Sequence, residues 1–347
     1  MEIQKIKLII WDLDQTIWNG ILTEDEQVVL KPGIVEVIKT LDSRGILQSI
    51  ASKNNYEEAI GKLREFGLEE YFLYPQVGWN AKSVSISTIV KSINIGANTV
   101  AFVDDQDFEL EEVKFKLPDI LCINAAYLDE ILEMEVMKPN FITVDAKDRR
   151  KMYQSDIKRK VAEENFEGPQ EIFLETLGIE LFINTAEKED LQRAEELTIR
   201  THQLNTTGYT YSYEELEKLQ RSEDYLLLTA GLKDKFGDYG KIGLALVELC
   251  GDVWKIKLFL MSCRTMSTGA GSVFLDFLIR LAHKQGKRLL AEFKLSDKNK
   301  MMYVTYKFAG FEVIGREDEV EILENSFRTI RPEPDYMKLH VNIKHHF

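Results

Sequence analysis

Short apolar runs alternate with amphipathic stretches through the first 140 residues of the chain. Strands are predicted for residues 7–11, 46–52 and 99–105, where apolar side chains are grouped in compact runs. Helices are predicted for residues 32–45, 56–67 and 83–96, with Pro32 at the start of the first and Gly45 and Gly67 at two of the ends. Strands that alternate with helices indicate a parallel sheet in an α/β domain.

The pattern changes between residues 139 and 170, which are highly charged and contain Pro139, Gly168 and Pro169. We interpret this segment as a helical linker. The second half has its own alternation, which predicts a helix over 187–205, two strands around a Gly-rich turn over 225–249, and a strand, a long helix and a strand over 254–262, 272–288 and 288–295. We therefore expect a first domain over residues 1–140, a linker over 141–170 and a second α/β domain over 171–347.

Composition and charge narrow the class of protein. The 347 residues are 44% hydrophobic and 29% charged, which is typical of globular domains, and the length suggests two of them. The net charge of −14 argues against a general nucleic-acid binder. Three cysteines are too few for a disulfide or zinc framework. No apolar run resembles a signal peptide or approaches the roughly 20 residues needed to cross a bilayer, so we expect a cytoplasmic protein without a membrane partner.

Polar side chains stand where the predicted strands of the first domain end and where one helix begins: Asp12, Asp14, Ser52, Lys82, Asp104 and Asp105. In open parallel sheets, ligands bind at the carboxyl ends of the strands, so these side chains are expected to converge. Carboxylates from two strands form a hard oxygen site suited to Mg²⁺. One carboxylate is also a nucleophile towards phosphorus, and a second can serve as general acid and base. Hydroxyl and ammonium groups suit phosphoryl oxygens.

The sequences DLDQT, ASKN and VDD, together with Lys82, resemble in order the four motifs of the haloacid dehalogenase superfamily of phosphotransferases. The resemblance implies that Asp12 is the nucleophile and a Mg²⁺ ligand, and that Asp14 is the acid/base and a ligand through its backbone carbonyl. It further implies that Thr16 orients the loop, that Ser52 and Lys82 hold the phosphoryl group, and that Asp104 and Asp105 complete the metal site. The alternative for DLD alone is a turn at a strand end with Asp as a cap. Residues 17–32 and 70–81 leave no room for a large cap domain.

Three stretches of the second half extend the resemblance: residues 199–216, 234–248 and 258–271. Together with DLDQTIWNG, ASKNN and FVDDQDFE, they resemble the FkbH-like family. That resemblance implies an α/β fold, with a haloacid dehalogenase-like Rossmannoid parallel sheet and minimal cap, followed by a second α/β domain of the GNAT acyltransferase type with a mixed sheet. Family members take the glyceryl unit of 1,3-bisphosphoglycerate, remove its phosphates and load it as a thioester on the phosphopantetheine arm of an acyl carrier protein for polyketide biosynthesis. The implied substrate is thus a phosphorylated three-carbon acyl group.

Cys263 is the candidate nucleophile for the acyl step. Its thiolate can attack an acyl phosphate and expel phosphate. It follows a predicted strand, stands beside Arg264 and precedes a helix start rich in Ser, Thr and Gly, and both a cation and a helix N-terminus lower the pKa of a thiol. The alternative is a cysteine buried in the core, which is the commoner case for a lone cysteine near a strand.

Other candidates come from the family motifs. Arg264 resembles the start of the phosphate-binding loop of GNAT proteins, but Ser267 stands where the first glycine is expected and Thr268 where FkbH-like proteins usually carry Arg; Gly269 keeps the second glycine position. His202, Gln203 and Asn205, in THQLN, are implied to contact the acyl substrate. The family usually has Asn in place of His202, which is otherwise typical of a helix surface.

Two other functions remain open. The chain can be a haloacid dehalogenase-type phosphatase fused to an acyl-CoA-dependent N- or O-acetyltransferase that acts on a small amine or sugar. Ser267 and the SCR sequence around Cys263 count mildly against it. Alternatively, one domain is a non-catalytic scaffold. The complete set of motif residues counts against this role for the first domain.

Overall fold

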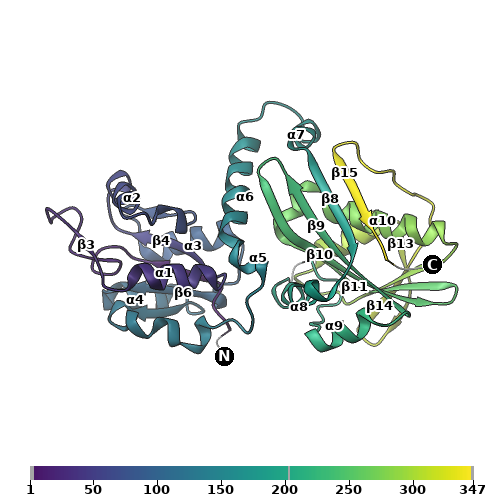
Figure 1. Ribbon diagram of the computed structural model, residues 1–347, viewed down its shortest axis with the longest axis horizontal. Coiled ribbons are helices and arrows are strands. Elements are labelled where there is room, and N and C mark those ends of the chain that lie inside the picture. The colour runs from purple at the N-terminus through teal and green to yellow at the C-terminus, as the bar shows by residue number, and fades with distance from the viewer. Residues whose placement is uncertain (1–3, 202–203, 345–347) are drawn as a thin grey trace. The chain divides into compact units, whose positions relative to one another are not determined.

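The computed structural model describes residues 4–201 and 204–344. The contacts within the chain divide it into two compact units, Met1–Gln154 and Ser155–Phe347 (Figure 1). The division falls inside α6 (Arg149–Glu164), a helix within the segment that the sequence indicates as a helical linker. Within the described residues, no helix combines the length and the apolar character needed to span a bilayer.

The first unit contains a five-stranded parallel sheet with the order β5-β4-β1-β6-β7. Its strands are β1 (Leu8–Trp11), β4 (Leu47–Ser52), β5 (Gln76–Val77), β6 (Val100–Asp104) and β7 (Leu121–Asn124). β1 lies at the centre, where Leu8 is opposite both Leu47 and Val100. All residues of β1, β4 and β6 are buried, which explains why the sequence shows continuous apolar runs there instead of alternation. The predicted parallel sheet is confirmed.

Helices connect these strands: α1 (Ile34–Ser43), α2 (Tyr56–Glu65), α3 (Lys82–Ile93) and α4 (Asp107–Lys116). The chain runs from β1 outward to β4 and β5, then crosses back through α3 to β6 and β7 on the other side of β1. The direction of winding therefore reverses between β1 and β6, and open α/β sheets bind their ligands at such a switch point. The shorter elements of this unit are η1 (Glu69–Tyr71), η2 (Ala97–Thr99), η3 (Ala125–Glu133), η4 (Glu135–Met137) and α5 (Val144–Lys147).

The segments predicted to leave no room for a cap domain hold only short elements. Residues 17–32 contain a small hairpin, β2 (Trp18–Asn19) and β3 (Val29–Leu30), in which Trp18 is opposite Leu30. Gly20 directly follows β2 with φ +103°, and a Cβ there would lie 2.9 Å from the Asp25 carboxylate. Residues 70–81 contain the end of η1 and the short strand β5. A minimal cap is therefore what these described residues form.

The second unit contains an eight-stranded mixed sheet with the order β13-β14-β12-β11-β10-β9-β8-β15. Its strands are β8 (Ile179–Thr185), β9 (Tyr225–Asp234), β10 (Gly237–Cys250), β11 (Val253–Met261), β12 (Arg288–Phe293), β13 (Phe311–Glu317), β14 (Val320–Asn325) and β15 (Met337–Asn342). Two neighbouring pairs, β11 with β12 and β15 with β8, are parallel, whereas the others are antiparallel. The predicted α/β class with a mixed second sheet is confirmed.

The helical elements of the second unit are α7 (Gln170–Leu177), η5 (Lys188–Asp190), α8 (Leu191–Arg200), α9 (Tyr213–Gln220), η6 (Cys263–Thr268), α10 (Ala270–Lys284) and α11 (Lys300–Phe308). The helix predicted over 187–205 is wrong at its end, because α8 stops at Arg200. Leu204–Thr206 instead lies beside β11, where Asn205 forms an isolated antiparallel bridge with Leu260, and we call this segment the strap. Its backbone is needed there as a hydrogen-bonding partner for β11.

The strap fills a gap that opens between two parallel strands. β11 and β12 pair only from Val253–Ile256 to Arg288–Ala291. Beyond that point the Thr206 N–H donates to the Phe259 carbonyl at 3.1 Å, and the Lys294 N–H donates to the Thr206 carbonyl at 2.9 Å. β11 and β12 diverge here and no longer provide hydrogen-bond partners for each other. The strap provides those partners for their buried backbone groups instead.

Candidate active site

The switch point of the first sheet carries a buried cluster of charge. Asp12 follows β1 directly and Lys82 is the first residue of α3; both are buried. The Lys82 ammonium donates to Asp12 Oδ1 and, at 2.9 Å, to the Ala51 carbonyl, and it lies 3.0 Å from Asp104 Oδ2. A single cation thus joins the carboxyl ends of β1, β4 and β6.

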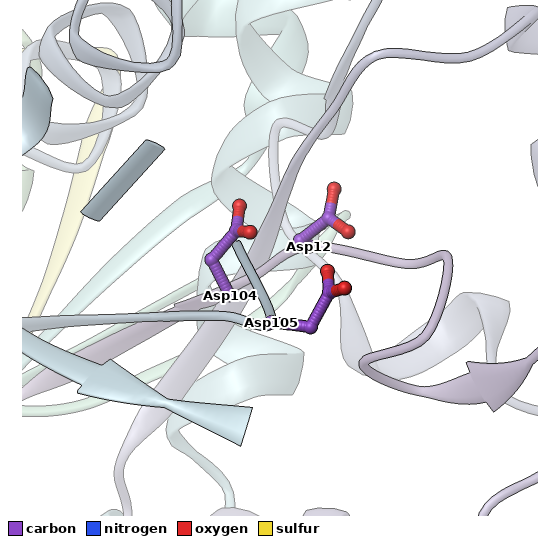
Figure 2. Close-up of side chains that lie close together, drawn as sticks. All are labelled: Asp12, Asp104 and Asp105. Atoms are coloured by element: carbon purple, nitrogen blue, oxygen red, sulfur yellow. The ribbon is translucent and has the colours of Figure 1, made fainter. Parts of the chain in front are cut away.

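Three carboxylates meet beside Lys82. One oxygen from each of Asp12, Asp104 and Asp105 lies within 4.8 Å of the others. Figure 2 shows them gathered at one spot, with Asp12 from the loop after β1 and with Asp104 and Asp105 from the end of β6. Asp104 Oδ1 accepts the Gln106 N–H at 2.9 Å, which fixes its direction.

The pKa values in this cluster reflect burial and crowding. Burial raises the pKa of Asp104 to about 6, because the neighbouring Asp12 adds to the desolvation and Lys82 offsets only part of it. Burial and Asp12 likewise raise the pKa of Asp105. Burial alone would lower the pKa of Lys82, but Asp12 and Asp104 outweigh it and raise that pKa, so the ammonium stays charged. Burial and the closeness of the carboxyl groups therefore make it harder for them to be ionised together.

The cluster fits a divalent cation. When all three carboxyl groups are ionised, they and the one ammonium leave two negative charges, the amount that Mg²⁺ or a similar ion would balance. Asp105 Oδ1 is buried and has no hydrogen-bond partner within residues 4–201 and 204–344, and such an oxygen lacks compensation unless a cation contacts it. Carboxylate oxygens are the ligands that Mg²⁺ prefers. Asp12, Asp104 and Asp105 would hold the ion; the predicted use of the Asp14 carbonyl stays a prediction.

Two further predicted residues lie beside the cluster. Ser52 is the last residue of β4, and its hydrogen bond to Asp12 is among the contacts that counteract the effect of burial on the Asp12 pKa. Thr16 is fully buried, and its backbone N–H donates to the Leu13 carbonyl at 3.1 Å, which tightens the turn after Asp12. Both residues lie where the sequence motifs place them, and their roles towards a phosphoryl group stay predictions.

Asp14 has a different environment from the three clustered carboxylates. Its Oδ1 accepts the Trp18 indole N–H at 2.7 Å and the Leu22 N–H at 3.1 Å, and its Oδ2 accepts the Asn54 amide at 2.8 Å. The motifs that predict the other site residues point neither to Asn54 nor to a polar contact of Trp18. The signal was present in the ASKN motif, where Asn54 follows Ser52 by two residues.

Comparison with known proteins agrees with this site. Residues 15–114 match the family model of haloacid dehalogenase-like hydrolases. The match includes Ser52, Lys82, Asp104 and Asp105 and begins just after Asp12 and Asp14. The expected similarity of the first unit to haloacid dehalogenase-like proteins is confirmed at this level, whereas the narrower resemblance to FkbH-like proteins stays a prediction. A search of curated proteins gives no match.

Solved structures give partial matches. The N-terminal part of a Bacteroides fragilis protein, which contains a phosphatase domain complexed with Mg, is 26% identical, with a TM-score of 0.36 over 38% of this chain and 41% of that one. The Escherichia coli ribosomal-protein-S18-alanine N-acetyltransferase is 18% identical, with a TM-score of 0.34 over 45% of this chain and 97% of that one. An N-acetyltransferase from Thermoplasma acidophilum in complex with coenzyme A is 18% identical, with a TM-score of 0.32 over 42% of this chain and 98% of that one.

In the second unit, Cys263 is partly buried and is the first residue of η6, two residues after β11 ends. η6 and Gly269 separate it from the first turn of α10, so the helix start is further from the thiol than the sequence suggests. Gly269 is the N-cap of α10 with φ +73°, and a Cβ there would lie 2.6 Å from the Tyr336 hydroxyl. Glycine is therefore required where the sequence keeps the second glycine of the loop.

Arg264 contacts protein groups. Its Nη2 donates to the Tyr239 carbonyl at 2.9 Å, and its Nη1 lies 3.9 Å from the Asp156 carboxylate on α6. Asp156 also accepts Arg159 Nη1 at 2.5 Å, and Arg159 forms a two-pronged ion pair with buried Asp234 at 2.6 and 2.9 Å. These contacts hold the Arg264 side chain beside β10 and α6, and its predicted binding of phosphate stays a prediction.

The remaining predicted residues lie in and before the strap. His202 and Gln203 fall outside the described residues. Asn205 is buried; its Oδ1 accepts the N–H groups of Thr207 and Gly208 at 3.1 and 2.9 Å, and its Nδ2 donates to the Tyr209 carbonyl at 3.3 Å. Its side chain therefore builds the turn after the strap, and a contact with an acyl substrate stays a prediction.

A pocket of about 550 Å³ lies next to this turn. Its lining includes Tyr209, Tyr211, Lys257 and Glu292. Lys257 is paired with Glu292, and burial, with Glu292 nearby, raises the pKa of Tyr211. These residues are spread over three segments, so no single motif in the sequence indicated them.

Proposed function

We propose that this chain is a Mg²⁺-dependent bifunctional enzyme that dephosphorylates a phosphorylated three-carbon acyl group and transfers the acyl group to a carrier-protein thiol. The finer proposal, taken from the FkbH-like motifs, is that the glyceryl unit of 1,3-bisphosphoglycerate is loaded on an acyl carrier protein. The observation that carries the phosphatase part is the convergence of Asp12, Lys82, Asp104 and Asp105 at the switch point of the parallel sheet.

The phosphatase chemistry follows from the contacts of these residues. An Asp12 oxygen attacks phosphorus, and the bond from phosphorus to the ester oxygen breaks. Asp14 gives its proton to that leaving oxygen and later takes one from the water that cleaves the aspartyl phosphate. Lys82 and Ser52 contact Asp12 and so lie where they can stabilise the phosphoryl oxygens. A bound Mg²⁺ would neutralise charge on those oxygens.

The acyl step is assigned to Cys263. Its thiolate attacks the carbonyl of the acyl phosphate, a carbon–sulfur bond forms and phosphate leaves; the carrier thiol then displaces Cys263 by thioester exchange. Support comes from its place at the end of β11, in the SCR motif of the FkbH-like resemblance. Its loop is also held in place by the contact of Arg264 with the Tyr239 carbonyl.

The alternative is a phosphatase domain fused to an acyl-CoA-dependent acetyltransferase. The observation that favours it is the loop before α10, which ends in Gly269 at the N-terminus of a 15-residue helix. Helix N-termini bind phosphates through free backbone N–H groups, and the diphosphate of coenzyme A is as suitable a ligand as the phosphate of a pantetheine arm. This alternative needs no thiol on the enzyme.

Intact-protein mass spectrometry separates the two proposals. The protein is incubated with Mg²⁺ and freshly made 1,3-bisphosphoglycerate, beside Cys263→Ala and Asp12→Asn, with Cys250→Ala as the control because Cys250 is an exposed cysteine elsewhere in the unit. We expect a glyceryl adduct that is lost only in Cys263→Ala and that retains its phosphate in Asp12→Asn. An adduct on none of the forms, with acetyl transfer from acetyl-CoA to an amine instead, would contradict the carrier-loading proposal.

A further inference from the structure

The Asp14 carboxylate is held by donors from two separate segments. Trp18 Nε1 and the Leu22 N–H both donate to Oδ1, at 2.7 and 3.1 Å, whereas Asn54 Nδ2 donates to Oδ2 at 2.8 Å. We call Trp18 and Asn54 the Asp14 clamp. Trp18 is 0% exposed and Asn54 is 1% exposed. A buried indole N–H or amide needs an acceptor, and for both side chains that acceptor is Asp14.

Each clamp residue is fixed by its own surroundings. Trp18 belongs to β2, is paired with Leu30 of β3, and its ring lies 6.2 Å from that of Phe66. Asn54 follows the end of β4, and its Oδ1 accepts at 3.2 Å the N–H of Asn55, the residue that caps α2. A carboxylate held on both oxygens by rigid groups keeps one rotamer, whereas a partly exposed Asp without such contacts samples several.

The clamp also distinguishes the two oxygens of Asp14. A carboxylate has about four lone-pair positions for hydrogen bonds. Within the described residues, Oδ1 accepts two bonds and Oδ2 accepts one. The position that remains is therefore on Oδ2, and this is where a proton can be carried without breaking a contact of the clamp.

We infer that Trp18 and Asn54 are positioning residues that aim Asp14 Oδ2 at the leaving oxygen during phosphoryl transfer, an inference that rests on the proposed phosphatase function. As the bond from Asp12 to phosphorus forms and the bond from phosphorus to the ester oxygen breaks, the proton moves from Oδ2 to that oxygen. An alkoxide is a poor leaving group and needs this proton, whereas a dinitrophenolate leaves without it. Loss of the clamp therefore affects alkyl phosphates selectively.

The test compares kcat/KM for β-glycerol phosphate and for 2,4-dinitrophenyl phosphate, both with Mg²⁺, because this parameter reports on the first phosphoryl transfer to Asp12. We expect Trp18→Phe and Asn54→Leu to lower the value for the alkyl ester on the order of a hundredfold, the lower end of general acid catalysis, and to change the value for the aryl ester little. Asp14→Asn should give the same selectivity or a larger one. Trp11→Phe is the matched control, since it also removes a buried indole hydrogen bond, to Gln48 at 3.1 Å.

Each outcome decides between a positioning and a structural role. Equal losses of kcat/KM on the two esters would overturn the inference, because a purely structural defect affects both substrates alike. The same would follow if the ratio of kcat/KM for the alkyl ester to that for the aryl ester were equal in Trp18→Phe and Trp11→Phe. If Trp18→Phe does not fold, as judged by near-ultraviolet circular dichroism, Asn54→Leu and the milder Asn54→Ser decide. A wild-type protein that cleaves neither ester would instead contradict the proposed function itself.

Discussion

The charged residues around Asp12 and those around the Cys263 loop differ in how they are compensated. In the first, Lys82 and three aspartates converge where three parallel strands end, and one of the carboxylate oxygens has no partner in the described chain. In the second, the arginines beside and opposite the Cys263 loop are engaged by carboxylates and a carbonyl, as in the Arg159–Asp234 pair. Uncompensated buried charge indicates a site that awaits a ligand, whereas compensated charge indicates a fold that is being held together.

The largest effect is expected from Asp12, the proposed nucleophile of the first unit. Asp12→Asn removes the attacking oxygen, so phosphatase activity should fall by a factor of ~10⁴ or more, as when other covalent nucleophiles are removed. Steady-state hydrolysis of an aryl phosphate measures it. Asp107→Asn, in the exposed first turn of α4, is the control and should change activity little; a comparable loss in both would contradict a specific role for Asp12.

The next effect is expected from the cation of the same cluster. Lys82→Met removes the proposed donor to the phosphoryl oxygens and leaves Asp12 and Asp104 without their shared ammonium. We expect kcat to fall by ~10²–10³, the usual cost of removing one such donor. Lys91→Met, at the exposed end of the same helix, controls for the loss of a positive charge on α3. Equal kinetics for the two variants would mean that Lys82 only stabilises the fold.

A matched change in the second unit should affect stability. Arg159→Met leaves buried Asp234 without its ion-pair partner, which typically costs about 3 kcal/mol of unfolding free energy. Urea unfolding of the full chain, followed by a probe in the second unit, measures it. Arg288→Met, which removes an exposed ion pair with Glu324, should destabilise far less. Phosphatase activity that falls with Arg159→Met, under conditions where the chain stays folded, would contradict the division of roles.

The smallest effect concerns pH. The pKa of Asp104 is raised from 3.8 to about 6 in the folded, metal-free protein, so the folded state binds a proton more readily than the unfolded state. Its ionisation therefore lowers stability as pH rises from about 4 to about 6, and the loss is fully present at pH 7. A bound cation removes this cost. We expect Mg²⁺ to raise Tm more at pH 7 than at pH 5, and we expect Asp104→Asn to abolish this difference between the two pH values. An Mg²⁺-induced rise in Tm that is equal or larger at pH 5 would contradict the prediction.

The sequence was more informative about the first unit than about the second, for a physical reason. In a parallel sheet each motif lies at a strand end, so the order of Asp12, Ser52, Lys82 and Asp104 along the chain suffices to predict that they meet. The Trp18 half of the Asp14 clamp could not be predicted, because its contact with Asp14 depends on the rotamer of a fully buried ring.

The strap and the contacts of Arg264 were also beyond the sequence. Residues 201–205 continue the polar character of α8, so nothing indicated that Leu204–Thr206 would pair with β11. Arg264 follows a strand in a loop that resembles a phosphate-binding loop, and only the fold places the Tyr239 carbonyl and Asp156 beside it. Long-range polar contacts of this kind have no periodicity along the chain.

The central claim is that Asp12 is the phosphoryl acceptor in a Mg²⁺-dependent site, and trapping of the phosphoenzyme tests it most directly. The protein is mixed with 2,4-dinitrophenyl phosphate and Mg²⁺, quenched in acid within milliseconds and digested, and the peptides are sequenced by mass spectrometry. We expect one phosphoryl group, on Asp12, that appears only with the metal and is absent from Asp12→Asn. Turnover without a phosphorylated Asp12, or undiminished turnover by Asp12→Asn, would contradict the account.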